Sequence, residues 1–319
     1  MMELSIMKKI KRLCKAVILL NCIVFYASPE LNAQSPFKAP LDQPRFYRLK
    51  VGNMIVTALT DGTIPINLKD LLTDVNPGEI DSLSGRFYQT ATEEASVNAY
   101  LVQTDGKLIL IDAGAAELYG PTLGHITESL KEVGYTPGQI NVVLITHIHT
   151  DHTGGLMAGN KMVFPNAKIY ISKPEMDFWM NPENKRRSPE RLGHWFDEAE
   201  VKVGPYKGAG KVITFGYGKE LFPGITPLAA PGHTPGHTFY ALESNGQKIV
   251  FMGDIIHAPA VQFPDPKVTI IFDVDPKAAA AQRIKAFSDA AKKGYWIAAD
   301  HVSFPGIGHL RKDGKGCHR

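Results

Sequence analysis

The feature that most constrains this chain is a dense cluster of metal-binding side chain types, Thr146-His-Ile-His-Thr-Asp-His-Thr-Gly-Gly155. Its three histidines and one aspartate lie within six positions, directly after the apolar run 141–146. A run without polar alternation is typical of a strand buried on both faces. Side chains this close in sequence converge at little cost in chain entropy, and the glycines permit a tight turn. Imidazole and carboxylate groups together suit Zn²⁺, Mn²⁺, Fe²⁺ or Co²⁺, so we expect a metal site here.

Three further candidate ligands follow other apolar runs. They are His233 in Pro231-Gly-His-Thr-Pro-Gly-His237, Asp254 in Phe251-Met-Gly-Asp254, and His301 in Ala299-Asp-His301. With the first cluster they make seven donors, which is more than one tetrahedral zinc needs and therefore predicts two metal ions. A carboxylate can bridge two ions whereas a histidine cannot, so either Asp254 or Asp151 is the expected bridge.

Hydrophobic periodicity predicts two halves of similar order. In the first half, strands are expected over 54–59, 97–103, 107–111 and 141–146, with turns at Asp61-Gly62 and Asp105-Gly106 and a helix over 122–133. In the second half, strands are expected over 225–230, 237–243, 247–252 and 295–299, with an alanine-rich helix from Pro276 to about Lys293. This order predicts an α+β sandwich of two mixed sheets with helices outside.

The first 33 residues have the pattern of a secretory signal peptide. A basic segment from Lys8 to Lys15 precedes the apolar run 16–26, which is short for a membrane span, and Ala33 offers a cleavage position. We therefore expect residues 1–33 to be removed and the protein to be exported, periplasmic or secreted, with no stable membrane anchor. Residues 34–319 are then expected to form one domain, with a helical insertion at about 172–200.

Charge and cysteine usage narrow the class of protein further. The chain carries a formal net charge of +3, and the first 33 residues alone account for it. A neutral body argues against nucleic acid as a partner, because such surfaces need a basic excess. After cleavage of the leader only Cys317 remains of the three cysteines, so no internal disulfide is expected.

With these residues identified, the chain resembles the metallo-β-lactamase superfamily over roughly Arg45 to His309. The resemblance rests on the motif His147-x-His149-x-Asp151-His152 together with His233, Asp254 and His301. It implies an αβ/βα sandwich with the following ligand sets: His147, His149 and His233 for one metal, Asp151, His152 and His301 for the other, and Asp254 as the bridge. Segments 231–238, 253–257 and 303–309 are most similar to the methyl parathion hydrolase and lactonase group.

This resemblance implies a hydrolase in which a hydroxide bridging two divalent ions attacks the carbonyl carbon or phosphorus of a bound ester. Zn²⁺ is the first expectation, with Mn²⁺, Fe²⁺ and Co²⁺ as alternatives. Asp151 and Asp254 are the candidates for steering the proton. The expected substrates are small lactones, aryl esters or phosphotriesters, and the similar group is commonly dimeric, which suggests a homodimer.

Pocket and supporting residues follow from the same resemblance and from sequence position. Aromatic walls suit an apolar aryl or acyl group. The pocket candidates are Tyr119, Trp179, Phe196 and His257, with Trp195 as a weaker choice. His237 and Asp300 are expected to support the ligands through hydrogen bonds rather than to bind metal.

Three other functions are compatible with the sequence. A hydroxyacylglutathione-hydrolase-like thioesterase shares the ligand set, although it typically adds a helical domain after its last histidine. A β-lactam hydrolase of the common dizinc type would offer a cysteine ligand, and no cysteine lies between Cys22 and Cys317. The third alternative, from a different class, is a non-catalytic metal-binding module.

Overall fold

A computed structural model describes residues 43–314 and 316–319 of the chain. The expected signal peptide, residues 1–33, lies outside the described residues. Among the helices of the described ranges, none combines the length and the apolar character that crossing a membrane requires.

The first sheet joins an antiparallel meander to a set of parallel strands. Its seven strands, in spatial order, are β1 (Phe46–Val51), β2 (Met54–Asn67), β4 (Thr92–Thr104), β5 (Lys107–Ile111), β6 (Val142–Leu144), β9 (Lys168–Ser172) and β10 (Val212–Phe215). The first four pair antiparallel, as the sequence predicts, and β5, β6, β9 and β10 run parallel. Parallel strands end at the same edge of a sheet, so the segments that follow β5 and β6 lie close together.

The second sheet carries the later ligand candidates. Its five strands, in spatial order, are β11 (Ile225–Ala229), β12 (Thr238–Ser244), β13 (Gln247–Phe251), β15 (Trp296–Ala298) and β16 (Ile307–Gly308). β13 and β15 are parallel neighbours, and the other pairs are antiparallel. His233, Asp254 and His301 each lie a few residues past the end of β11, β13 or β15.

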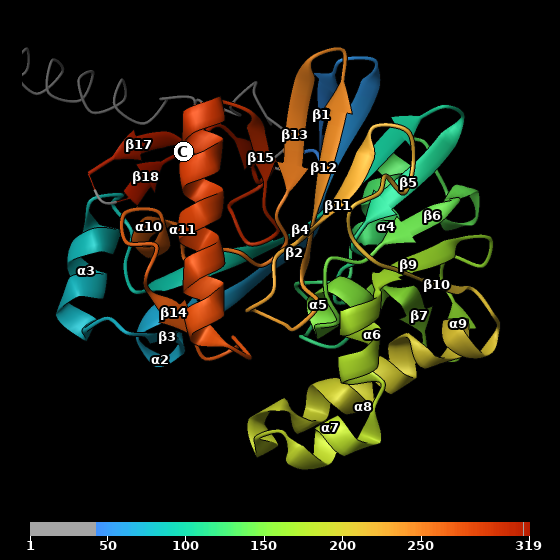
Figure 1. Cartoon of the computed structure of the whole chain (residues 1–319), viewed down its shortest axis with the longest axis horizontal. Coiled ribbons are helices and arrows are strands. Elements are labelled where there is room, and N and C mark those ends of the chain that lie inside the picture. Colours follow the sequence, from blue (N-terminus) through green and yellow to red (C-terminus); the bar gives the residue numbers. More distant parts are fainter. Residues whose placement is uncertain (1–42, 315) are drawn as a thin grey trace, which may run out of the picture. The chain divides into compact units, whose positions relative to one another are not determined.

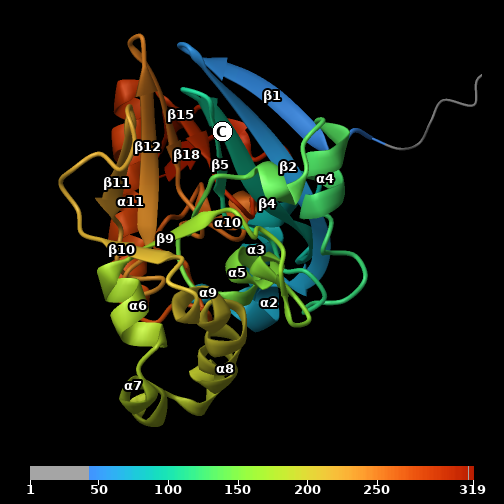
Figure 2. The ribbon, with the colours of Figure 1, turned by 90° about the vertical axis from the view of Figure 1, so that its right-hand side faces the viewer.

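Apolar side chains from both sheets meet in a shared core. Val56 and Leu144 of the first sheet and Tyr240 of the second belong to the same buried cluster. The other face of the first sheet packs against α4 (Ile126–Glu132), and the other face of the second packs against α11 (Pro276–Lys293). Figure 2 shows these two helices on opposite outer sides of the sheets. This is the predicted αβ/βα sandwich.

The remaining elements are short. They are α2 (Leu68–Leu71), β3 (Leu72–Thr73), α3 (Pro77–Gly85), α5 (Thr150–Thr153), β7 (Met157–Ala158), β8 (Lys161–Met162), α10 (Pro259–Gln262), β14 (Thr269–Ile270), β17 (Arg311–Asp313) and β18 (Gly316–His318). β3 pairs with β14, β7 with β8, and β17 with β18.

The helical insertion is longer than the expected range of 172–200. It consists of α6 (Lys173–Trp179), α7 (Pro182–Arg187), α8 (Gly193–Lys202) and α9 (Gly204–Gly208). The glycine-rich stretch 204–218 contains α9 and strand β10. Pro205 stands in the first turn of α9, where its fixed φ favours a helix start. Figure 1 shows α6, α7 and α8 grouped at the lower end of the fold.

Strand β2 does not end at Asp61-Gly62 as predicted. It continues to Asn67 past a register shift between Thr60 and Gly62, an irregularity of the kind that redirects a side chain. The Asp61 side chain is thereby buried beside the loop that follows β5. The predicted turn at Asp61-Gly62 is therefore an irregularity within one strand.

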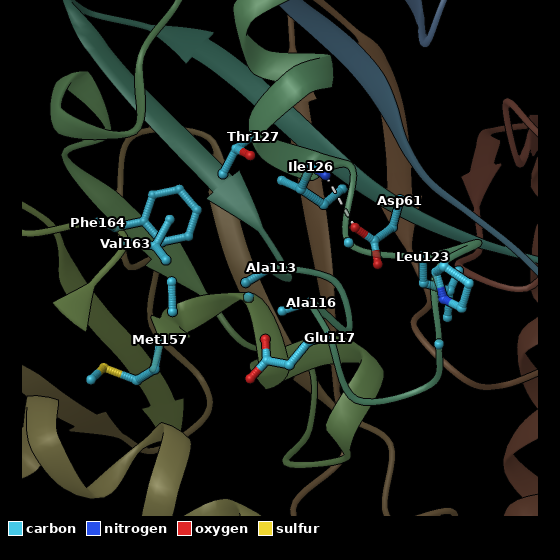
Figure 3. Close-up of a pocket in the computed structure, with 15 residues that line it drawn as sticks. Asp61, Ala113, Ala116, Glu117, Leu123, Ile126, Thr127, Met157, Val163 and Phe164 are labelled. Atoms are coloured by element: carbon cyan, nitrogen blue, oxygen red, sulfur yellow. Dashed lines mark hydrogen bonds between the residues drawn. The ribbon is translucent and has the colours of Figure 1, made fainter. Parts of the chain in front are cut away.

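The helix predicted over 122–133 begins at Ile126. Gly120 and Gly124 have positive φ angles, a conformation that breaks a regular helix. Asp61 supplies the missing start signal from a distant strand, because its Oδ1 accepts a hydrogen bond from the Ile126 N–H (3.1 Å; Figure 3). Its Oδ2 accepts another from the Ala115 N–H (2.9 Å). A single buried carboxylate therefore fixes both ends of the loop 115–126.

We expect Asp61→Asn to lower the free energy of unfolding by about 1–3 kcal/mol, because the amide NH₂ faces a buried N–H donor that loses its acceptor. Urea denaturation measures the change. The control is Asp70→Asn, an exposed aspartate for which a change within about 0.5 kcal/mol is expected. Equal effects of the two substitutions would contradict the assigned role of Asp61.

Candidate metal centre

The structure brings together all seven side chains that the sequence singles out. They form two groups of donors: His147, His149, His233 and Asp254, and Asp151, His152, Asp254 and His301. Within each group the ligand atoms lie within 4.8 Å of one another. Asp254 belongs to both groups, which is the position required of a bridging carboxylate.

Distances around Asp254 match those between ligands of a shared ion. Its Oδ1 lies 3.0 Å from His152 Nε2, and its Oδ2 lies 3.1 Å from His301 Nε2. On the other side, Oδ2 lies 3.4 Å from His233 Nε2 and 3.5 Å from His147 Nε2. Two ligands at about 2.0–2.1 Å from one tetrahedral zinc are about 3.3 Å apart, so the carboxylate can serve both groups.

Three histidines are held through their Nδ1 atoms. His152 Nδ1 lies 2.9 Å from Asp112 Oδ2, and His233 Nδ1 lies 2.8 Å from Asp273 Oδ1. His301 Nδ1 lies 2.8 Å from the carbonyl oxygen of Ser96. Partners of this kind fix the ring orientation and the tautomer, and they leave Nε2 directed toward the centre.

Unsatisfied polar atoms indicate what the centre is built to hold. The Nε2 atoms of His147 and His152 are buried and make no hydrogen bond within residues 43–314 and 316–319. Buried polar atoms in proteins normally have partners, so these two point to a ligand. His149 faces the same group through Nδ1, which lies 3.0 Å from His233 Nε2. Neutral imidazoles and carboxylates within this spacing fit divalent cations of the zinc type.

Electrostatics give His147, His149 and Asp254 the charge states that a cation needs. At His152, His233 and His301 the surrounding carboxylates outweigh burial and raise the pKa. Burial lowers the pKa of His147 and of His149 well below the usual value, so both rings are neutral and keep a free lone pair. Burial alone would raise the pKa of Asp254, but His152 and the other surrounding imidazoles hold it well below its usual range. The shared carboxylate is therefore anionic.

His237 and Asp300 lie beside the ligands, as predicted for supporting residues. His237 Nε2 accepts a hydrogen bond from the Asp254 N–H (3.1 Å), and burial lowers the pKa of its ring to about 3. Asp300 Oδ2 lies 3.1 Å from His152 Nδ1, and burial raises the pKa of this carboxyl well above its usual range. His237 belongs to neither donor group.

Sequence reasoning missed three buried carboxylates that hold the site. Asp112 accepts hydrogen bonds from the Thr146 N–H (2.8 Å) and from the Thr146 hydroxyl Oγ1 (2.6 Å). It also lies against His152, and its backbone φ angle is 59°. The sequence contains a pattern that indicates Asp112, because this residue directly follows an apolar strand, as the ligands do. Asp273 and Glu175 gave no local signal, since their partners are distant in sequence.

A cavity of about 370 Å³ opens onto this centre. Tyr119 and His257, two of the predicted pocket residues, line it together with His149, Asp151, Asp254 and His301. His257 Nε2 lies 3.1 Å from Asp254 Oδ2, and burial lowers the pKa of His257 to about 4. Contact of these side chains with a substrate stays a prediction.

Trp179 and Phe196 are corrections to the predicted pocket, because both are buried in the core of the helical insertion and neither lines the cavity. Trp195 lines it instead and stacks on His149 with ring centroids 4.2 Å apart. Adjacent residues on a helix point about 100° apart, so Trp195 faces the cavity while Phe196 faces the core. Arg191 and His194 at the start of α8, which the sequence did not suggest for the pocket, also line the cavity.

A second cavity of about 520 Å³ is lined in part by the loop after β5, at Ala113 and Ala116 (Figure 3). Its wall includes Asp61, Met157 and Phe164, and it contains none of the seven donors. Glu117 at its rim pairs with the buried Lys202 (2.9 Å). The histidine-lined cavity is therefore the candidate functional site.

Comparison with known proteins agrees with this fold. The model of the metallo-β-lactamase superfamily matches residues 92–298, so the chain belongs to that superfamily. A solved structure of AbOPH, described as a hydrolase in the β-lactamase superfamily, is similar at 34% identity with a TM-score of 0.82. That match covers 86% of this chain and 96% of AbOPH.

Other similar proteins are lactonases. The structure of AidC, a dizinc quorum-quenching lactonase in complex with a product, N-hexanoyl-L-homoserine, matches at 30% identity with a TM-score of 0.81. The match covers 86% of this chain and 96% of AidC. An N-acyl homoserine lactonase of Bacillus thuringiensis is 28% identical over 164 residues, which cover 46% of this chain and 57% of that protein. The chain thus spans little more than half the length of the curated relatives it matches.

We expect the metal-free chain to take up two Zn²⁺ per polypeptide, and Asp254→Ala to hold fewer than two because both donor groups lose a shared ligand. Elemental analysis after gel filtration measures the stoichiometry. His309→Ala is the control, since His309 is exposed, packs on Trp296 and belongs to neither group. Two retained ions in the Asp254 variant would refute the bridging assignment.

Proposed function

We propose that the protein is an exported, dinuclear metal-dependent hydrolase that acts on small lactones and related esters. The observation that carries the proposal is the placement of Asp254, which both donor groups share at the floor of a ligand-sized cavity. Similarity to AbOPH and to lactonases supports hydrolysis as the reaction class. The basic and apolar leader supports export.

We assign His147, His149 and His233 to one ion, Asp151, His152 and His301 to the other, and Asp254 to both. Divalent ions held there supply Lewis acidity and lower the pKa of bound water from 15.7 to about 7. Zn²⁺ fits the donors, and Mn²⁺, Fe²⁺ and Co²⁺ are alternatives.

The protein's own side chains then orient the substrate and move the proton. Asp151 is 15% exposed and lines the cavity, so it can accept a proton from water and pass it to a leaving oxygen. Burial raises the pKa of Tyr119 to about 12, so its phenol stays protonated and can donate a hydrogen bond to an oxygen that gains charge. Both groups lie where a bound ester would reach the centre.

The rest of the cavity wall favours substrates with an apolar part. Ile64, Ile66, Ile270, Phe272 and Trp195 also line the cavity. A polar floor and an apolar wall together suit a molecule with an ester or lactone at one end and an acyl or aryl group at the other. A volume of about 370 Å³ admits a small molecule of this kind.

A substrate panel tests the proposal directly. We expect kcat/KM of the zinc-loaded protein to be highest for acyl-homoserine lactones, simple lactones or aryl acetates, lower for methyl parathion, and lowest for a cephalosporin. Dominance of the cephalosporin would contradict the proposed substrate class. A metal-loaded protein that turns over none of them would instead indicate the non-catalytic module.

Replacing the indole at the cavity wall should weaken binding of the apolar group. For Trp195→Phe we expect KM for an aryl or acyl ester to rise about 3- to 10-fold with a smaller effect on kcat, since one aromatic contact contributes about 0.5–1.5 kcal/mol. Steady-state kinetics measure both constants. Phe196→Leu is the matched control: it should lower the unfolding free energy and leave KM unchanged, because Phe196 faces the core. The reverse pattern would restore Phe196 as the pocket residue.

A further inference from the structure

Glu175 is a carboxylate buried in the first turn of α6, and it belongs to neither donor group. Its Oε1 accepts hydrogen bonds from the Ile148 N–H (2.7 Å) and from the Trp179 Nε1–H (2.8 Å). Its Oε2 accepts hydrogen bonds from the Thr234 hydroxyl (2.8 Å) and from the Gly236 N–H (2.8 Å). All four partners are donors, and such bonds to a buried charged acceptor are strong.

These partners come from the two loops that carry His147, His149 and His233, and the first of these loops also carries Asp151 and His152. Ile148 lies between His147 and His149 in the first loop, and Thr234 directly follows His233 in the second. The carboxylate therefore joins backbone and side chain groups that are adjacent in sequence to three histidines. Among the described residues, the Glu175 carboxylate makes its hydrogen bonds to Ile148, Trp179, Thr234 and Gly236 and to none of Asp151, His152 and His301.

Backbone packing brings α6 unusually close to the second loop. A Cβ atom added at Gly236 would lie 2.2 Å from the Glu175 backbone nitrogen, so only glycine allows this approach. The Gly236 carbonyl oxygen also accepts a hydrogen bond from the Ser172 hydroxyl (2.7 Å), at the N-cap of α6. The start of α6 and the His233 loop thus form one rigid contact.

Trp179 extends the same connection to the cavity wall. Its indole packs edge-on against His149 with ring centroids 5.4 Å apart, and against Trp195 at 6.3 Å. Because its Nε1–H is held by Glu175, the orientation of the indole depends on the same carboxylate.

We propose that Glu175 is the positioning residue of the metal position formed by His147, His149 and His233. This inference rests on the proposed function. It means that one buried carboxylate sets the spacing between two loops that are far apart in the sequence. If Glu175 loses an acceptor oxygen, the ion held by His147, His149 and His233 should bind more weakly. The ion held by Asp151, His152 and His301 should bind as before. Groups that orient metal ligands typically change metal affinity 10- to 100-fold when replaced.

The test is Glu175→Gln, which keeps the shape of the side chain but replaces an acceptor oxygen by an NH₂ that faces donors. We expect one of two Zn²⁺ ions to bind about 10- to 100-fold more weakly, measured by competition with a chromophoric chelator. The visible absorption of the Co²⁺-loaded protein should change in parallel, because it reports coordination geometry. Thr234→Val should give the same change to a smaller extent, and Thr234→Ser, which keeps the hydroxyl, should retain wild-type affinity.

Asp61→Asn serves as the control for a buried carboxylate that accepts backbone hydrogen bonds but touches neither histidine loop. It should lower stability and leave both ions bound. If Glu175→Gln loses stability as Asp61→Asn does but keeps wild-type affinity for both ions and an unchanged Co²⁺ spectrum, the positioning role is overturned. If Glu175→Gln does not fold, the Thr234 pair decides by the same criteria. Wild-type protein with fewer than two ions would contradict the proposed function itself, independently of these variants.

Discussion

The constraint on which the structure depends is the convergence of five buried or nearly buried imidazoles and two carboxylates on one point. Side chains of this kind are costly to remove from water unless each polar atom finds a partner. Asp112, Asp273 and the Ser96 carbonyl satisfy one nitrogen of three of the rings. The Nε2 atoms of His147, His152, His233 and His301 lie within 3.0–3.5 Å of the Asp254 carboxylate, where a cation could bind them. The fold around this site has to be rigid enough to hold several imidazoles and carboxylates close to one another.

Rigidity comes from the way the two sheets end at the same place. The loops after β5 and β6 supply Asp112 and the first histidine cluster, and the loops after β11, β13 and β15 supply His233, Asp254 and His301. The shared apolar core lies between the sheets, so a shift of one sheet against the other would separate the two halves of the donor set. Packing of ordinary aliphatic and aromatic side chains thereby fixes distances of about 3 Å at the site.

Sequence alone predicted the parts of this arrangement that depend on local pattern. Strand ends followed by His or Asp gave all seven donors, and the order of strands and helices gave the sandwich. What depends on long-range contact was not predictable: Asp61 starts a helix more than sixty residues away, and Glu175 and Asp273 hold loops of other elements. Trp195 and Phe196 show the same limit, because neighbouring aromatic residues carry the same composition signal and only the packing of α8 decides which one faces the cavity.

The helical insertion connects the wall of the cavity to the candidate metal site through direct contacts. Its first helix contributes Glu175 and Trp179, and its third contributes Trp195, which stacks directly on His149. A change in the packing of Trp195 that alters the apolar wall also acts on the His149 ring, whose centroid lies 4.2 Å from that of Trp195. Substitutions that broaden the cavity are therefore expected to be tolerated where they leave this stack in place, as on the Ile64 and Ile66 side contributed by β2.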